Sequence, residues 1–260
     1  MPVLTSLLDI ALPLVVSLLL LLWLNRLVTV TVVRLFWHFV GDSRLAFLLY
    51  ALLILPGTAV HELSHWLAAR LLGVRAELPV LLPRTIKLQG PVTLGHVMIA
   101  RTDVVRRSLI GVAPFLAGSA LVVLIARQAF GLDEPTRVLV GTEGALKVAA
   151  ALLRSVGDSV RARPDAWLYL YLLFAISNGM LPSPSDREAW PWVAFLAALV
   201  VAATYLFAGV PELPAILTLW LLRMVRWLTF AFLVTVVINT CFVLGTWPLE
   251  RLVAAVRGGA

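Results

Sequence analysis

The residues best suited to chemistry in this chain are His61, Glu62 and His65, which form an H-E-x-x-H motif. On a helix, residues four apart lie on one face, so both imidazoles can reach one zinc ion. Glu62 stands between them, where it can take a proton from a zinc-bound water. A chance match to the motif is expected roughly a few times in a thousand, given only four histidines in the chain. The motif predicts a hydrolytic zinc site; a buried polar cluster that packs helices together is the alternative.

A catalytic zinc ion takes three protein ligands and keeps one position open. His38 and His96 are possible third ligands, but Asp186 is the stronger candidate. Pro182 and Pro184 precede it and cannot continue a helix, so backbone groups are freed near membrane depth. Irregular backbone at that depth is tolerated where it lines a polar cavity, and Asp186 would face such a cavity. The sequence therefore predicts Asp186 as the third ligand.

The composition indicates that these residues work inside a lipid bilayer. Hydrophobic residues make up 61% of the 260 residues and charged residues 13%, with a mean hydropathy of +0.98. A soluble domain carries about a quarter charged residues. The net charge of +7 comes mainly from arginines between apolar runs, which favours lipid headgroups as their partners. We expect no nucleic-acid partner, and the single cysteine, Cys241, excludes a disulfide framework.

Long apolar runs predict an all-α polytopic membrane protein with about six transmembrane helices. The runs cover about 4–24, 45–72, 108–130, 166–181, 190–208 and 216–244, and Pro56-Gly57 interrupts the second. The first run lacks a basic leading region and a cleavage site, so we expect a retained membrane anchor. Residues 28–40 either extend this first helix or lie at the membrane interface.

Two stretches do not read as spanning segments. Residues 73–107 contain several prolines, glycines and short β-rich runs, which predict a small β-rich hairpin between the second and third helices. Residues 145–160 have apolar residues near helical spacing, as in an amphipathic helix on the membrane surface. We divide the chain into an N-terminal anchor (1–44), a core with the candidate site (45–188) and C-terminal transmembrane helices (189–260).

Basic residues predict the orientation in the membrane, because cytoplasmic loops are rich in Lys and Arg. Segment 73–107 is the most basic loop; it carries Arg75, Arg84, Lys87, Arg101, Arg106 and Arg107. Counting helices from a cytoplasmic 73–107 puts both termini in the cytoplasm and brings His65 and Asp186 to the same face. We expect a multi-pass protein of the plasma membrane of a prokaryote.

The motifs resemble those of the site-2 protease family of intramembrane zinc metalloproteases. Residues 61–74, HELSHWLAARLLGV, are similar to the family's first motif, and residues 178–186, NGMLPSPSD, resemble its second, an asparagine and two prolines before an aspartate. Residues 111–118, GVAPFLAG, stand where the family has a small-residue and proline patch. The likeness covers about residues 56–186. It departs at Arg187, where the family usually has glycine, and at the prolines, which lie one step later after Asn178.

The resemblance implies hydrolysis of peptide bonds in or near transmembrane segments of membrane-protein substrates. It makes Asn178 a catalytic residue that holds the substrate backbone or the developing oxyanion, unless the Asn-Gly pair only ends a helix. Residues 90–100 would bind an unwound substrate by strand addition, or form an ordinary hairpin. His96 is either a strand residue or has a gating or metal-binding role.

Two other classes of function remain open. The first is a non-proteolytic membrane scaffold or transporter that keeps a structural or relic zinc site, although a transporter would want ionisable residues spread over several helices. The second is a zinc hydrolase of a lipid or small amide, which would share the metal chemistry.

Overall fold

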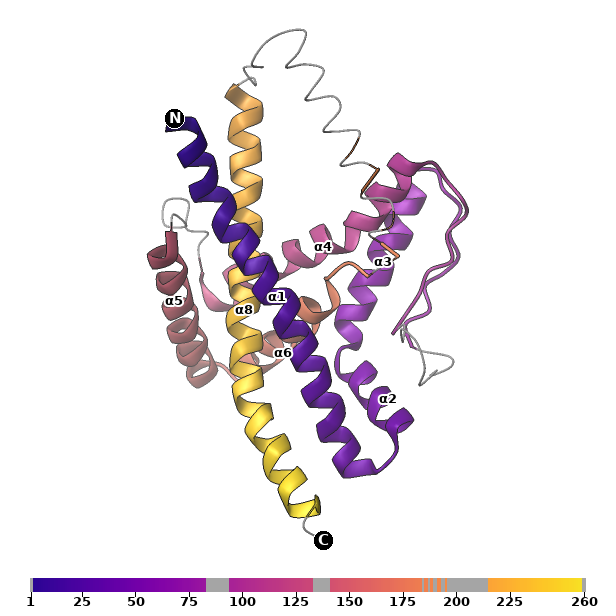
Figure 1. Ribbon diagram of the computed structural model, residues 1–260, viewed down its shortest axis with the longest axis vertical. Coiled ribbons are helices and arrows are strands. Elements are labelled where there is room, and N and C mark those ends of the chain that lie inside the picture. Colours follow the sequence, from indigo (N-terminus) through magenta and orange to yellow (C-terminus); the bar gives the residue numbers. More distant parts are fainter. Residues whose placement is uncertain are drawn as a thin grey trace.

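The computed structural model describes residues 2–82, 94–132, 141–183, 185–186, 188, 191–192, 195 and 215–258 (Figure 1). Within these residues the chain folds into seven helices. They are α1 (Pro2–Val40), α2 (Ser43–Leu53), α3 (Leu55–Leu71), α4 (Val104–Phe130), α5 (Gly141–Ala162), α6 (Ala166–Gly179) and α8 (Ala215–Gly258). The protein is therefore largely helical, as the sequence predicted. The predicted helix at 190–208 lies almost entirely outside the described residues.

Three helices are long and apolar enough to cross a membrane, and they indicate a membrane protein. These spans are Leu12–Val40, Val104–Phe130 and Leu222–Arg257, and the bent pair of α2 and α3 raises the number to four. Helix α6 has 14 residues and is about 21 Å long, short of a hydrocarbon core of about 30 Å. The described part of the chain thus gives no support to a count of six spans.

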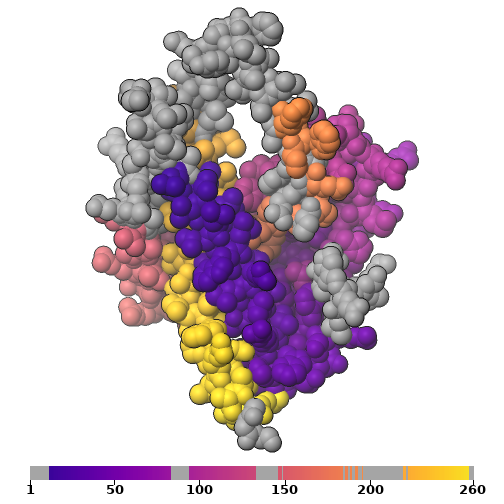
Figure 2. Space-filling view, in the orientation of Figure 1, coloured from indigo at the N-terminus to yellow at the C-terminus, as the bar shows by residue number. Residues whose placement is uncertain are grey.

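The first and last helices lie against each other along one face of the molecule (Figures 1 and 2). Residues 28–40 extend α1, because the helix continues to Val40 with Arg26 and Arg34 exposed. Both helices run in the same direction, and His38 near the end of α1 lies 3.6 Å from Glu250 near the end of α8. The termini therefore lie at opposite ends of the molecule (Figure 1). Two parallel crossings would put them on opposite sides of a membrane, so this arrangement gives no support to two cytoplasmic termini.

A sharp break separates α2 from α3, which together form one long apolar stretch bent by 70°. Asp42 starts α2, since its carboxylate accepts hydrogen bonds from the backbone N–H groups of Arg44 and Leu45. Pro56 in the first turn of α3 has no N–H to donate back across the break. The Leu53 carbonyl is satisfied instead by the Tyr171 hydroxyl of α6, at 3.0 Å. The break sets the direction in which α3 presents the H-E-x-x-H motif.

Segments 74–82 and 94–100 run side by side between α3 and α4. Two isolated antiparallel bridges join them, Ala76 with Ile99 and Val80 with His96. The described residues contain no longer strand, so the predicted β-rich hairpin is present only as this irregular pairing. A Cβ on Gly95 would lie 2.9 Å from side-chain atoms of both Thr58 and Glu62. The pairing therefore lies against the face of α3 that carries Glu62.

One apolar core joins the helices. Its buried members come from α1, α2, α4, α5, α6 and α8 and include Leu21, Val28, Tyr50, Val122, Leu152, Leu173, Phe230 and Phe232. The predicted amphipathic segment forms α5, which buries Leu152 and exposes Leu146 and Leu153. A second, smaller cluster packs Ala69 of α3 against Ile110 of α4, and the candidate site lies where α3, α4 and the end of α6 meet.

Candidate metal centre

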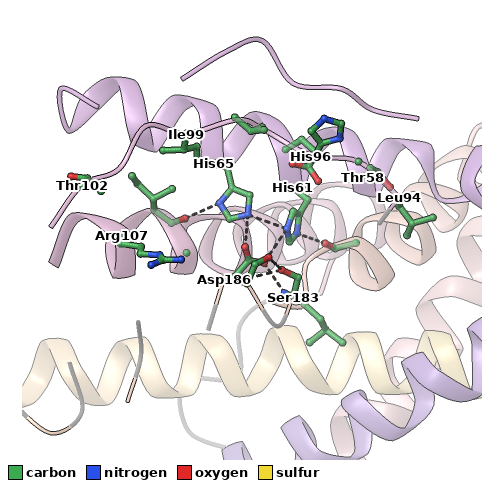
Figure 3. Close-up of a pocket in the computed structure, with 18 of the residues that line it drawn as sticks. Thr58, His61, His65, Leu94, His96, Ile99, Thr102, Arg107, Ser183 and Asp186 are labelled. Atoms are coloured by element: carbon green, nitrogen blue, oxygen red, sulfur yellow. Dashed lines mark hydrogen bonds and ion pairs between the residues drawn. The ribbon is translucent and has the colours of Figure 1, made fainter. Parts of the chain in front are cut away.

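The structure brings together His61, His65 and Asp186, the three residues expected to bind a metal (Figure 3). The two histidines lie one turn apart on α3, and Asp186 comes from the loop after α6. The Nε2 atoms of His61 and His65 are 3.1 Å apart. They lie 3.3 Å and 3.0 Å, respectively, from the Asp186 carboxylate oxygens. Two imidazole nitrogens and a carboxylate thus converge on one point.

Backbone carbonyls orient both imidazoles. His61 Nδ1 lies 2.7 Å from the carbonyl oxygen of Gly179 at the end of α6, and His65 Nδ1 lies 2.9 Å from that of Ile110 in α4. A carbonyl can only accept, so each Nδ1 carries a proton, and each Nε2, the atom through which the neutral ring would bind a metal, faces Asp186. Metal-binding histidines almost always have such a partner on the second nitrogen. The three converging acceptors could hold a metal ion.

The loop that carries Asp186 is held by its own hydrogen bonds. The Ser183 N–H donates to Asp186 Oδ2 at 2.6 Å, and the Asp186 N–H donates to Ser183 Oγ at 3.3 Å. These two bonds hold the Asp186 carboxyl group where it faces the imidazoles of His61 and His65.

Close backbone contacts at glycines set the separation of the three site-bearing elements. A Cβ on Gly111 of α4 would lie 2.3 Å from the Asp186 carbonyl oxygen. A Cβ on Gly57 of α3 would lie 1.9 Å from the Ala175 carbonyl oxygen, and one on Gly179 would lie 2.4 Å from the Gly57 carbonyl carbon. Only glycine permits these approaches. They bring the Gly179 carbonyl within reach of His61 and seat Asp186 against α4.

A cavity of about 1090 Å³ contains the three residues, and Glu62 lines it beside them. The Glu62 side chain is buried, and no residue that the structure describes donates a hydrogen bond to its carboxylate. His96 also lines the cavity but is not part of the described group of potential metal ligands. Arg101 and Arg107 also line the cavity, and Arg107 pairs with Glu188. The cavity lining thus combines the buried carboxyl group of Glu62 with two exposed arginines.

Asn178 lines the same cavity, but its side chain is already engaged. Its amide donates to the carbonyl oxygen of Phe174 at 2.8 Å and to Asn239 Oδ1 at 3.0 Å. Its own Oδ1 accepts from Asn25 Nδ2 at 3.1 Å. In this arrangement neither amide hydrogen is available to a substrate. A catalytic role for Asn178 remains a prediction that would require one of these bonds to exchange.

Sequence reasoning missed Asn25 and Asn239, which lie far from the motifs and contact Asn178 from α1 and α8. A signal was available, since polar residues within apolar spans are costly and usually have a partner in the bundle. It also missed the contact between Gly57 and Gly179, which no local pattern distinguishes from other helical glycines.

No protein-family model matches the chain, and neither a curated protein nor a solved structure is detectably similar to it.

Proposed function

We propose that this chain is a membrane-embedded zinc metallopeptidase that hydrolyses peptide bonds in or near transmembrane segments of membrane-protein substrates. The observation that carries the proposal is the convergence of His61 Nε2, His65 Nε2 and the Asp186 carboxylate, with Glu62 in the same cavity. In this reading the chain is a multi-pass protein of a prokaryotic plasma membrane that resembles the site-2 protease family. The described arrangement favours termini on opposite sides of that membrane.

The spacing of the ligand atoms suits zinc. Zinc–nitrogen bonds of about 2.0–2.1 Å in a tetrahedron require neighbouring ligand atoms about 3.3–3.4 Å apart. The two Nε2 atoms are 3.1 Å apart; His61 Nε2 lies 3.3 Å from Asp186 Oδ2, and His65 Nε2 lies 3.0 Å from the other carboxylate oxygen, Oδ1. Three lone-pair acceptors so close together repel one another unless a cation lies between them. Two nitrogens and one oxygen also leave a fourth position open, as in catalytic rather than structural zinc sites.

Zinc bound there would activate a water as nucleophile and polarise the substrate carbonyl. Glu62 would act as the general base: its carboxylate oxygen takes a proton from the attacking water and passes it to the nitrogen of the leaving amine. The carbonyls of Gly179 and Ile110 would keep the imidazoles in the tautomer that binds metal through Nε2. The surrounding apolar helices would keep bulk water away from the site, which strengthens the electrostatic interactions inside it.

The cavity wall supports an extended peptide as substrate. Backbone hydrogen bonds join His96, Met98 and Ala100 to segment 75–80. Alternate residues of a strand turn their N–H and C=O groups to opposite edges, so Val97 and Ile99 present theirs on the other edge. Both residues line the cavity. An unwound substrate segment could add to this edge, and a helical one could not, because its carbonyls are already bonded.

Metal analysis of the purified protein tests the proposal. We expect one zinc per chain in the native protein and loss of most of it in His65→Ala and Asp186→Ala, because two remaining ligands bind zinc weakly. Asp158→Ala is the matched control, since its carboxylate is exposed on α5 and pairs with Arg161. Undiminished zinc in Asp186→Ala would reject Asp186 as a ligand. A native protein that binds no divalent metal would reject the proposed function.

A further inference from the structure

Three asparagines from distant parts of the chain meet beside the candidate metal centre. Asn25 lies in α1, Asn178 in the last turn of α6 and Asn239 in α8. Asn239 is fully buried and Asn178 nearly so. A buried amide is costly unless its donors and acceptors find partners. The contacts of this cluster are therefore specific, and they join the first and last helices to the end of α6.

The cluster lies beside two backbone carbonyls at the end of α6 that have no partner within the helix, and it hydrogen-bonds one of them directly. The last helical bond runs from the Met180 N–H to the Ile176 carbonyl, so the Asn178 and Gly179 carbonyls need partners from outside the helix. Asn25 Nδ2 donates to the Asn178 carbonyl at 3.1 Å. His61 Nδ1 donates to the Gly179 carbonyl at 2.7 Å. The two carbonyls belong to consecutive peptide units, so rotation of one displaces the other.

The same amide of Asn25 also holds the Asn178 side chain at its Oδ1. Asn239 Oδ1 accepts from Asn178 Nδ2 on the opposite side, at 3.0 Å. The Asn178 side chain is thus hydrogen-bonded to both α1 and α8, and its backbone carbonyl is hydrogen-bonded to α1 as well. Figure 1 shows the end of α6 lying beside the pair of α1 and α8. These two helices lie largely outside the region that resembles a metalloprotease core.

We infer that Asn25 and Asn239 are positioning residues for the metal centre: they hold Asn178, and thereby fix the Gly179 carbonyl that orients the His61 imidazole. The inference rests on the proposed function, because it concerns the affinity of the proposed zinc site. Helices α1 and α8 thus have a role beyond anchoring. If they separated from α6, the Gly179 carbonyl could shift, and His61 would lose the hydrogen bond that sets its tautomer and orientation. A change in the packing of α1 against α8 would reach the metal through this path.

Metal affinity in detergent tests the inference, measured by competition with a chromophoric zinc chelator. The variants are Asn25→Leu and Asn239→Leu, which keep the side-chain size and remove the amide. Loss of direct partners of metal ligands costs about 10- to 100-fold in affinity, so we expect about 10-fold for these more distant residues. The visible spectrum of the Co²⁺-substituted protein should change in both variants, because it reports the geometry around the metal.

Thr29→Val is the matched control on α1. It removes the hydrogen bonds of the Thr29 hydroxyl with Tyr50 of α2 at 2.8 Å and with the Asn25 backbone carbonyl at 2.9 Å, and it leaves the Asn25 side-chain amide in place. Thermal unfolding and circular dichroism establish that each variant is folded at the temperature of the assay. The inference is overturned if both leucine variants keep native affinity and Co²⁺ spectrum, or if Thr29→Val loses as much affinity as they do. Failure of the native protein to bind zinc or Co²⁺ would instead reject the proposed function, and this inference with it.

Discussion

Replacement of Gly111 by alanine should displace Asp186 and weaken the metal site. A Cβ at Gly111 would lie 2.3 Å from the Asp186 carbonyl oxygen, and ordinary contact begins at 3.4 Å, so the carbonyl must retreat by about 1.1 Å, the difference. The atoms in contact would be the new Cβ and the backbone of Asp186, so no flexible side chain can move aside to relieve the overlap. Metal–ligand distances tolerate about ±0.2 Å. The displacement is several times larger, and we expect zinc affinity to fall about 10- to 100-fold.

Gly245→Ala in α8 is the matched control, because a Cβ there meets nothing within 4 Å. Both substitutions gain about 0.5–1 kcal/mol of helix propensity, so a difference between them reports the contact with Asp186. The assay is chelator competition on folded protein in detergent, with thermal unfolding measured alongside. Equal zinc affinity in Gly111→Ala, Gly245→Ala and the native protein would refute the claim that α4 seats Asp186.

Two further predictions concern the helices. Tyr171→Phe should lower the free energy of unfolding by about 1–3 kcal/mol, because it leaves the Leu53 carbonyl unsatisfied at the break between α2 and α3. Thermal unfolding in detergent measures this loss. Tyr169→Phe, which removes a hydroxyl without a described hydrogen bond, should cost less stability. Epitope tags at the two ends should be accessible from opposite sides of the membrane, and two tags on one side would contradict parallel single crossings of α1 and α8.

Much of the candidate centre was predictable because its residues leave local signals. Histidines four apart on a helix share a face wherever that helix lies. Helix α6 ends at Gly179, two residues before the predicted end at 181 and ahead of Pro182, and the Asp186 carboxylate reaches the histidines. The metal itself, and the roles assigned to these residues, remain predictions.

The end of α4 at Phe130, before Gly131, was predicted from the apolar run, whereas its start at Val104, capped by Asp103, lies four residues before the predicted 108. The sequence left open whether residues 28–40 extend the first helix, because Arg26 and Arg34 interrupt the apolar run. Arginine is a good helix former, and both side chains point outward, so α1 continues without a break.

Contacts between distant helices could not be predicted from sequence alone. Gly57 and Gly245 both occur in apolar helical segments, yet only Gly57 meets another backbone. Asn25 and Asn178 are 153 residues apart in sequence, and nothing near either residue identifies the other as its partner. Such contacts depend on which helix faces meet, and this follows from packing of the whole bundle.

Replacement of Glu62 by glutamine tests the central claim most directly. The amide is nearly isosteric but cannot accept a proton near neutral pH, and loss of a general base typically costs about 100- to 10,000-fold in rate. Glu77→Gln is the control, because Glu77 is an exposed acid outside the cavity. Membrane-protein fragments are compared by proteomics in cells that carry the native chain, either variant or no chain. We predict that Glu62→Gln keeps its zinc but gives the fragment profile of the null strain, while Glu77→Gln matches the native profile. A native profile with Glu62→Gln, in cells where the null strain differs, would contradict the peptidase and favour a non-catalytic zinc protein.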